Sequence, residues 1–545
     1  MRKIVVLLLL ILSMVGAAIG QGDTYTRKSV TFLDAIILAS PEARDLSLNQ
    51  IDFIGEKVKE RVQLPRFDFN PLPENSPLTR EFIAQVNSRG SLSMDEIANI
   101  LNRTFVPQII EIMDEYAEQR ASELVDEATK MSFITTKAKD LGITAENLEQ
   151  VFNSGFIYLP FMNSYTRVVD SEKEGDKTKY TVTVSIGGGI FWFKIAYMDG
   201  KTSVKPVVKN ESKSIGFATK YDYGEAEERA FEAAVLNYAR NLENATKDYD
   251  EFKLSTQVAE VVGTTLGFRM GRKEGLRIDD RFVVGEYVES SDGELKFKKD
   301  GFIRIRDVAD NRDNGGELSH GYGVIVGDWA PGMSLVEYPR LNLDIYGLIG
   351  GLPLSTESSF YNVEGGPAIG MEIAYNIGGL TKSPHWYFDL GLMVGGATIS
   401  DSWTGDDIFD SVTRFLVSGS LIKRLQWRRL DAFTQLGFAH QQTWGNWENA
   451  NGDSYSNRNE NNGLMAGLGL NYTLNINLTA GIRYSLYTGK SEEWTRYDAD
   501  NNELGDVSSD FPMLSYSGTT IAVQIIYAPP SLAFDPASAL SNVIP

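Results

Sequence analysis

The chain has 545 residues, of which 73 are acidic and 52 basic, so it carries a net charge of −21. This balance argues against a nucleic-acid partner, because binding to phosphates requires a basic surface. The chain has no cysteine, which excludes disulfide bonds, thiolate catalysis, thiolate metal sites and a lipid-modified N-terminal cysteine. Its length leaves room for several domains.

Residues 1–20 have the features of an export signal peptide. Arg2 and Lys3 precede an apolar stretch from Ile4 to Val15, and Ala18-Ile19-Gly20 forms a small-x-small cleavage site. The alternative is an uncleaved N-terminal membrane anchor. No later stretch reaches the ~18 consecutive apolar residues that a spanning helix needs, so any further membrane insertion has to use strands.

Residues 21–154 are predicted to form a mainly helical periplasmic segment. Apolar residues from Leu46 to Val62 recur at helical spacing, and Ser93-Met94-Asp95-Glu96 matches a capping box. Ile109 to Met131 is a long amphipathic stretch, typical of a packed helix. Between the first two helices, Phe67 to Pro73 is expected to be an extended connector because it contains two prolines.

Residues 155–262 are predicted to be an α+β periplasmic domain. Four runs are expected to be strands, namely Phe156–Phe161, Tyr180–Val184, Phe191–Tyr197 and Phe252–Val258. Glu225 to Lys247 is predicted to be a helix rich in alanine. Gly187-Gly188-Gly189 is interpreted as a bend, because no Lys-Ser/Thr pair follows it as in a phosphate-binding loop. The order of these elements resembles the α/β domains of curli-secretion and related periplasmic assembly proteins.

Residues 263–340 are predicted to be a small SH3-like β domain. The run from Gly275 to Val284, with Gly301 to Val308 and Pro331 to Tyr338, resembles the C-terminal module of the flagellar assembly protein T family. The resemblance implies an SH3-like barrel that serves for docking or spacing. It implies no functional residue, because such modules occur on many unrelated proteins.

Residues 341–528 alternate between large apolar and small or polar side chains, as strands with one apolar face do. Eight strands are predicted: Leu341–Gly350, Ala368–Ile377, Trp386–Ala397, Val412–Lys423, Arg429–Gln441, Leu464–Tyr472, Ile476–Tyr487 and Thr519–Tyr527. The connections alternate between long and short, and the whole resembles small outer-membrane barrels of the OmpA and OmpX type. We therefore expect an antiparallel eight-stranded transmembrane β-barrel, with both ends and a C-terminal tail, 529–545, in the periplasm. The alternative is a soluble β-sandwich.

The inward positions of these strands are predicted to fill the lumen with ion pairs, because eight strands leave little more than room for side chains. The residues concerned are Asp344, Glu372, Asp389, Arg414, Asp431, Arg483 and Gln524. An aromatic girdle is expected near the strand ends, formed by Trp386, Tyr387, Trp427, Trp444, Tyr472, Tyr484 and Tyr487.

Three further patterns could carry chemistry, although we assign no catalytic, cofactor-binding or metal-binding residue. His440 lies at the outer end of a strand, where outer-membrane hydrolases place a histidine, but its spacing identifies no partner. Asp498-Ala499-Asp500-Asn501-Asn502 starts like a calcium loop but lacks the glycine and the closing glutamate. Lys423, Arg424, Arg428 and Arg429 form a basic cluster at a short turn, where they could meet lipid phosphates.

The sequence thus favours a non-enzymatic protein of the cell outer membrane, with outer-membrane lipid and a periplasmic protein as partners. Its barrel would anchor a periplasmic protein-binding module that serves envelope organisation or assembly. One alternative is a surface adhesin or ligand binder that acts through its outer loops. Another is an outer-membrane hydrolase built around His440.

Overall fold

The computed structural model describes residues 28–33, 36–62, 64–72, 77–87, 93–104, 107, 155–198, 201–289, 295–312, 316–449 and 451–530. They form two compact units, one built mainly from Tyr25–Leu254 and the other mainly from Leu276–Pro530. The export signal, the Ile109–Met131 stretch and residues 531–545 lie outside the described residues. No helix among the described residues is both long enough and apolar enough to cross a membrane.

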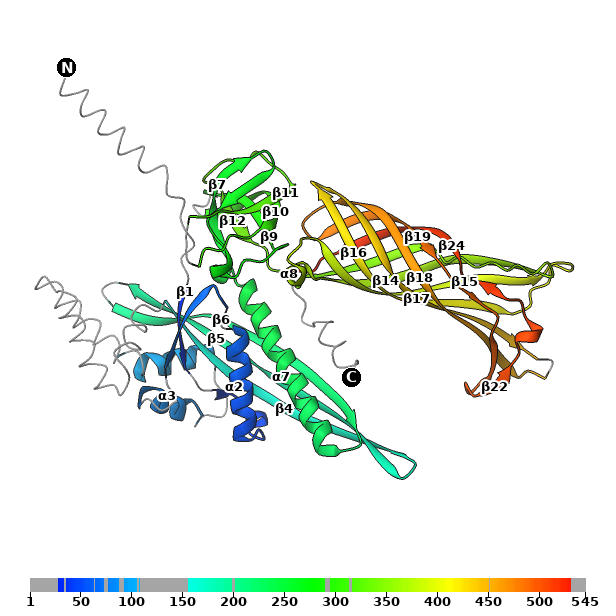
Figure 1. The fold of residues 1–545 in the computed structure, drawn as a ribbon. Coiled ribbons are helices and arrows are strands. Elements are labelled where there is room, and N and C mark those ends of the chain that lie inside the picture. Colours follow the sequence, from blue (N-terminus) through cyan, green and yellow to red (C-terminus); the bar gives the residue numbers. More distant parts are fainter. Residues whose placement is uncertain are drawn as a thin grey trace, which may run out of the picture. The chain divides into compact units, whose positions relative to one another are not determined.

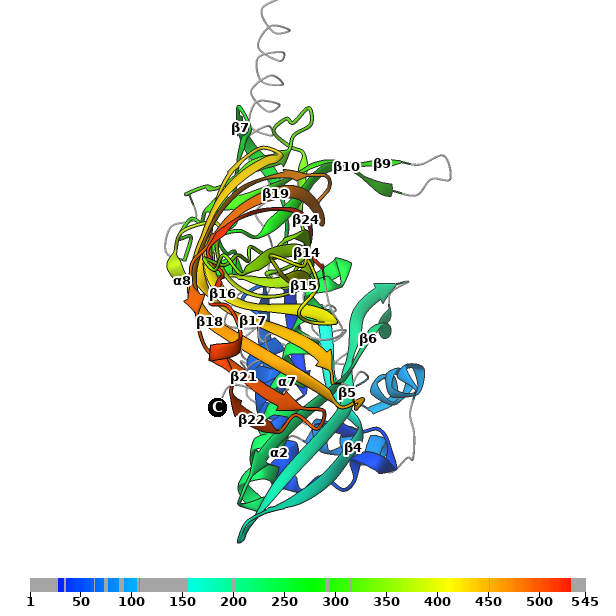
Figure 2. The same cartoon turned by 90° about the vertical axis from the view of Figure 1, so that its right-hand side faces the viewer.

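The first unit is a mixed β-sheet with helices packed on it, and its strand order is β3-β1-β4-β5-β6, with β2 paired to β4. The strands are β1 (Lys28–Leu33), β2 (Ile37–Leu38), β3 (Phe67–Leu72), β4 (Phe156–Glu174), β5 (Lys177–Met198) and β6 (Lys201–Lys220). The helices are η1 (Pro41–Ala43), α2 (Leu48–Val62), α3 (Pro77–Asn87), residues 94–104, α7 (Tyr223–Asp248) and η2 (Asp250–Phe252). Figure 2 shows β4, β5 and β6 running side by side.

Helix α7 forms the centre of this unit because its sequence gives it both a start and an apolar face. The Asp222 carboxylate accepts a hydrogen bond from the Glu225 N–H at 2.8 Å, which caps the first turn. Ala226, Ala230 and Ala234 follow at a spacing of four residues, and all three are fully buried against the sheet. Such small side chains let the helix backbone approach the strands closely.

Several elements of this unit differ from the expectation. The segment predicted to be mainly helical contributes β1, β2 and β3, and Phe67–Leu72 is a strand that pairs in parallel with β1. Strand β6 was not predicted, because its lysines, among them Lys201, Lys205 and Lys209, interrupt the apolar alternation that marks a strand. The capping box at Ser93 is confirmed, since the Ser93 hydroxyl accepts from the Glu96 N–H and the Glu96 carboxylate accepts from the Ser93 N–H.

Gly187–Gly189 was predicted to be a bend, and that prediction is wrong. The three glycines lie inside the continuous strand β5, where they let Phe161, Asn210 and Tyr238 come close. A Cβ atom on Gly188 would lie 2.2 Å from the Phe161 carbonyl oxygen, so only glycine fits there without a shift. The triple glycine therefore serves close packing within the sheet.

The second unit contains two closed barrels. The small barrel has the strand order β10-β11-β8-β7-β12-β9. Its strands are β7 (Ser255–Val262), β8 (Thr265–Phe268), β9 (Arg281–Glu289), β10 (Leu295–Asp307), β11 (Ser319–Ile325) and β12 (Ser334–Glu337), and η3 (Arg272–Glu274) lies between β8 and β9. The predicted boundary at 262/263 therefore divides the β7–β8 hairpin, and β7 belongs to this barrel.

The large barrel is an antiparallel closed sheet of eight strands (Figure 1), in which the first and last strands pair with each other. Its strands are β13 (Leu343–Gly351), β14 (Tyr361–Asn376), β15 (Trp386–Asp401), β16 (Ser411–Trp427), β17 (Leu430–Glu448), β18 (Ser454–Thr473), β19 (Leu478–Tyr487) and β24 (Gly518–Tyr527). The long connection between β19 and β24 carries β20 (Lys490–Ser491), β21 (Trp494–Asp498), β22 (Glu503–Asp506), η4 (Ser508–Asp510) and β23 (Leu514–Ser515), while α8 (Gly378–Thr381) fills a short turn. The predicted eight-stranded barrel is confirmed.

The outer surface of the large barrel is apolar at the alternate positions that the sequence indicated. Ile369 is 67% exposed, Leu436 67% and Ile521 67%, although each is a large hydrocarbon side chain. The aromatic girdle is only partly confirmed. Tyr387 and Tyr487 are buried in the lumen. Successive residues of a strand face opposite sides of the sheet, and these two occupy inward-facing positions.

All seven predicted lumen residues are buried in the interior, as expected. The Arg483 guanidinium donates to both oxygens of Glu372 at 2.7 Å, and its Nε donates to Gln524 at 3.1 Å. Asp389 accepts hydrogen bonds from Ser420 and Gln435 at 3.1 and 3.2 Å. The lumen is therefore occupied by ion pairs and hydrogen-bonded side chains along its length.

Candidate functional site: the junction between the two barrels

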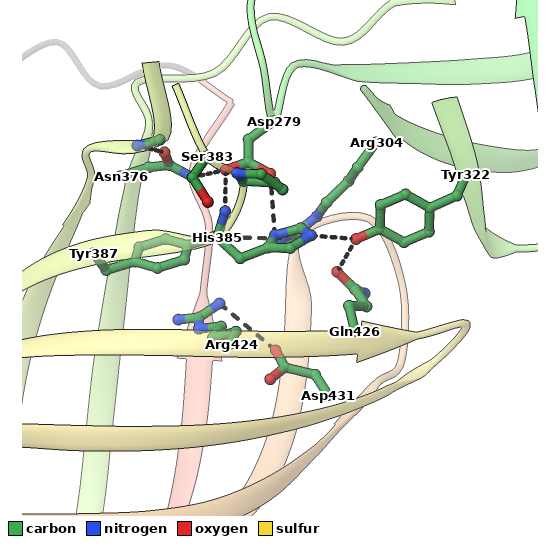
Figure 3. Close-up of polar contacts among 12 residues, drawn as sticks. Asp279, Arg304, Tyr322, Asn376, Ser383, His385, Tyr387, Arg424, Gln426 and Asp431 are labelled. Atoms are coloured by element: carbon green, nitrogen blue, oxygen red, sulfur yellow. Dashed lines mark hydrogen bonds and ion pairs between the residues drawn. The ribbon is translucent and has the colours of Figure 1, made fainter. Parts of the chain in front are cut away.

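The densest cluster of buried charge in the second unit lies where the small barrel meets the short turns of the large barrel. We call this cluster the junction (Figure 3). It is formed by Asp279, Arg281, Arg304 and Tyr322 of the small barrel, Arg340 of the linker, and Asp344, Asn376, His385, Tyr387, Arg424, Gln426 and Asp431 of the large barrel.

Asp279 connects the small barrel to the turn between β14 and β15. It precedes β9 in a left-handed backbone conformation, with φ of 71°, and is fully buried. Its Oδ2 accepts from the His385 N–H at 2.7 Å and from Asn376 Nδ2 at 2.9 Å. A Cβ atom on Gly378 would lie 2.7 Å from the same Oδ2, so this turn needs glycine to admit the carboxylate.

His385 continues the contact to a second strand of the small barrel. Its Nδ1 lies 3.0 Å from Asp279 Oδ1, and its Nε2 lies 2.6 Å from the Tyr322 hydroxyl. The hydroxyl also lies 3.1 Å from Gln426 Oε1 on β16. Arg304 Nη1 lies 3.4 Å from the same Nδ1, so the imidazole contacts a carboxylate, a guanidinium and a hydroxyl.

The protonation of the junction follows from its burial and its cations. Burial is the main cause that lowers the pKa of His385 to about 3, and Arg304, Arg424 and Lys423 lower it further while Asp279 opposes them. Burial alone would raise the pKa of the Asp279 carboxyl, but His385, then Arg304 and the hydrogen bonds donated by Asn376 and the His385 N–H, hold this pKa below its ordinary value. At neutral pH the junction therefore contains a neutral His385 and a charged Asp279.

Arginines and carboxylates complete the junction at the mouth of the lumen. Arg424 pairs with Asp344 at 2.9 Å and with Asp431 at 3.8 Å, and its guanidinium lies 4.0 Å from the Tyr387 ring centroid. Arg340 of the linker approaches Asp344 at 3.6 Å. Opposite charges thus meet inside a protein environment, where an unpaired charge would be costly.

The small barrel also contacts the turn between β18 and β19. Arg281 Nη1 donates to the Ile476 carbonyl, and Asn477 Nδ2 donates to the Tyr338 hydroxyl at 2.7 Å. Together with the two turns described above, the small barrel holds three separate turns of the large barrel.

The junction joins elements of the two barrels through buried side chains. A hydroxyl, an imidazole and a carboxylate in a row could in principle form an acid–base relay. However, Asp279 is 0% exposed and His385 only 6%, and both side chains bridge elements of two barrels. No group of three or more His, Asp or Glu side chains that could hold a metal ion occurs in the part of the chain that the structure describes.

The candidate residues from the sequence lie elsewhere or act differently. His440 faces outward near the rim, 2.9 Å from Asn462 and 3.0 Å from Gln442, and has no carboxylate or hydroxyl partner among its described hydrogen bonds. Asp498 accepts two hydrogen bonds from Asn502, which closes the hairpin between β21 and β22. Arg424 was placed in a basic cluster that could meet lipid, but it points into the barrel and is 3% exposed.

Four residues of the junction were named from the sequence in other roles, namely Asp344, Tyr387, Arg424 and Asp431. Those of the small barrel, and His385, were not assigned any role. One signal was available, because the chain has only three histidines and one of them, His385, follows Pro384 in a short turn. Asp279 lies in the run used for the SH3-like resemblance, where it reads as an ordinary turn residue. Only the fold brings these two residues together across 106 positions of sequence.

No protein-family model matches the chain. No curated protein matches it either. Among solved structures, the chain is similar to Neisserial surface protein A, with 9% identity and a TM-score of 0.24 over 34% of this chain and 97% of that one. It is also similar to the outer membrane protein OprG from Pseudomonas aeruginosa, with 9% identity and a TM-score of 0.26 over 35% and 96% of the two chains.

A third similar structure is Ail, the attachment invasion locus protein of Yersinia pestis, with 10% identity and a TM-score of 0.21 over 34% and 96% of the two chains. All three matches cover about a third of the present chain. Because these scores are low, the strand pairing within the chain itself defines the barrel. The resemblances to curli-secretion proteins, to flagellar assembly protein T and to SH3-like barrels stay predictions.

Proposed function

We propose that the large barrel is a closed anchor in the outer membrane and that it holds a non-enzymatic, protein-binding module in the periplasm. In this proposal, the long loops lie outside the cell and the short turns face the periplasm. The module serves envelope organisation or assembly by presenting the first unit to a protein partner.

The observation that carries the proposal is the combination of an apolar outer surface with a filled lumen. Exposed hydrocarbon such as Ile369 and Ile521, each 67% exposed, is stable only when lipid or another apolar phase covers it. Inside, the Arg483–Glu372 pair and the hydrogen bonds of Asp389 occupy the space that a channel would need. A barrel that is apolar outside and filled inside suits anchorage.

The junction supports the second half of the proposal. Three turns of the large barrel bind the small barrel through buried polar groups, so the small barrel is held firmly at the end of the short turns. Such a connection suits a small barrel that has to stay attached to the anchor.

Cysteine labelling in cells tests the proposed topology, because the natural chain has no cysteine. Trp403→Cys lies in a long loop, where the tryptophan is 84% exposed, and Lys298→Cys lies on the exposed surface of the small barrel. A membrane-impermeant maleimide should label the first variant on intact cells and the second only after the outer membrane is permeabilised. Equal labelling on intact cells, or recovery of the chain in the soluble periplasmic fraction, would contradict the proposal.

One observation favours the alternative of an adhesin or ligand binder. Phe360 and Trp403 are 63% and 84% exposed on two long loops that are joined by a hydrogen bond between the Ser402 N–H and the Phe360 carbonyl. Exposed aromatic residues of this kind are common anchors in binding surfaces. If a chain that keeps residues 1–20 but lacks residues 21–340 supports the phenotype, and Phe360→Ser with Trp403→Ser abolishes it, the adhesin hypothesis replaces the anchor hypothesis.

A further inference from the structure

Four basic side chains gather on one side of the large barrel at the level of the short turns. We call Lys382, Lys423, Arg428 and Arg429 the basic rim. In the part of the chain that the structure describes, none of the four forms an ion pair, although the whole chain carries a net charge of −21. The surrounding turns, 376–386, 421–430 and 470–478, contain no acidic residue.

Three of the four cations are held in place by aromatic rings. Lys423 lies 5.0 Å from the Trp386 ring centroid, Arg428 lies 6.0 Å from that of Trp427, and Arg429 lies 5.9 Å from that of Tyr472. These are the distances of cation–π contacts. The cations lie on β16 and in the β16–β17 turn, and their rings lie on β15, β16 and β18, so the three pairs occupy neighbouring positions of the rim.

Backbone contacts orient two of these cations further. Lys423 Nζ donates to the Pro384 carbonyl at 2.6 Å, and Arg429 Nη1 donates to the Leu474 carbonyl at 3.2 Å. Each cation has additional N–H donors beyond these bonds, because an ammonium group has three and a guanidinium group five. Positive charge and hydrogen-bond donors are therefore available at the rim for an anion.

The neighbours of the basic rim identify the kind of anion. Leu380 is 80% exposed, and Leu425 and Trp427 are each 70% exposed, and each lies within two residues of a rim cation in the sequence. A free phosphate ion gains nothing from contact with apolar side chains. A phospholipid can place its acyl chains against them and its phosphate against the cations. Arg424, the remaining basic residue of these turns, faces Asp344 in the lumen and takes no part.

We propose that the basic rim binds the headgroup phosphate of an anionic phospholipid in the leaflet that surrounds the short turns. This inference rests on the proposed membrane anchorage and adds a lipid preference to it. It also explains why the cations of the basic rim have no acidic partner in the described part of the chain, because a lipid phosphate would supply the counter-charge.

The test uses the full chain inserted in nanodiscs that contain equal amounts of phosphatidylglycerol and phosphatidylcholine, with retained lipids counted by native mass spectrometry. The natural chain should retain more phosphatidylglycerol than phosphatidylcholine. In Lys382→Gln/Arg428→Gln/Arg429→Gln, the preference should fall about fivefold for each charge removed, given about 1 kcal/mol per basic residue near an anionic surface. Lys296→Gln/Lys298→Gln/Lys299→Gln on the small barrel changes the net charge equally and should keep the preference.

Three outcomes overturn the inference and can be told apart from failure of the anchor. Equal retention of both lipids by the natural chain, or an unchanged preference in the rim variant, shows that the rim does not select the lipid. Loss of the preference on addition of inorganic phosphate shows that the site takes a free anion. Heat-modifiable gel migration of every variant is measured first, because a chain that does not insert refutes the anchor instead.

Discussion

Replacing Glu372 by glutamine should destabilise the large barrel more than any comparable change on its surface. Glu372 and Arg483 form a bidentate pair in the lumen, with both N–O distances at 2.7 Å and with side chains only 4% and 3% exposed. Glutamine has a similar shape, but it leaves the guanidinium without its counter-charge. The remaining partner of Arg483, Gln524, is neutral and cannot compensate.

The expected loss is about 3–5 kcal/mol, because that is the cost of leaving one charge of a buried ion pair unpaired. Removing both charges should cost much less, since a buried ion pair is often no more stable than apolar side chains of similar volume. Glu372→Leu/Arg483→Met is therefore expected to be more stable than Glu372→Gln, although it carries one more substitution.

Urea unfolding in phospholipid vesicles, followed by tryptophan fluorescence and gel mobility, gives the free energy of unfolding by linear extrapolation. The matched control is Glu357→Gln, which removes the partner of Lys490 in an ion pair whose side chains are 66% and 50% exposed. It should cost less than about 1 kcal/mol. The reasoning fails if Glu372→Gln costs no more than this control, or if the double variant is the least stable of the three.

Three further predictions concern the packing of the first unit, the junction and the lipid-facing surface. Gly188→Ala would place a Cβ atom 2.2 Å from the Phe161 carbonyl oxygen, so thermal unfolding should show a loss of about 1–3 kcal/mol. Gly155→Ala meets no atom within 4 Å and should stay within about 0.5 kcal/mol, and equal effects would refute the packing argument. Because the pKa of His385 is about 3 in the junction and ordinarily 6.5, a released histidine binds a proton as the pH falls through this range, and docking of the small barrel should weaken. Spin-label distances between the two barrels should broaden from pH 7 to pH 4, and an unchanged distance contradicts this prediction. Ile369→Lys puts a charge on the apolar outer surface and should cost up to about 2–4 kcal/mol in vesicles, whereas no effect would argue against contact with lipid.

The large barrel could be predicted from the sequence because its signal is local. Alternation at every second residue reports which side of a strand is apolar, as in β24, where Ile521, Val523 and Ile525 are all exposed. The charged residues that face the lumen were predicted from the same alternation. The prediction was wrong for Tyr387 and Tyr487, since an aromatic residue near a strand end was assigned to the girdle without regard to its parity.

The first unit and the junction could not be predicted in the same way. Strand β1 pairs in parallel with β3 and β4, so its partners lie far away in sequence and leave no local pattern. Asp279 and His385 each resemble a common turn residue, and their significance arises only from a 2.7 Å contact between the two barrels. Long-range contacts of this kind depend on the whole fold, which a single sequence does not display.

The three turns that hold the small barrel give the junction a role in the order of assembly. The turns belong to three successive hairpins, represented by His385, Gln426 and Asn477, and the closed sheet arranges them around one end of the barrel. Closure in turn requires β13 to pair with β24, which lie almost at opposite ends of the barrel sequence. We therefore expect the small barrel to dock on all three turns only once the sheet has closed, so that its docking marks the end of barrel folding.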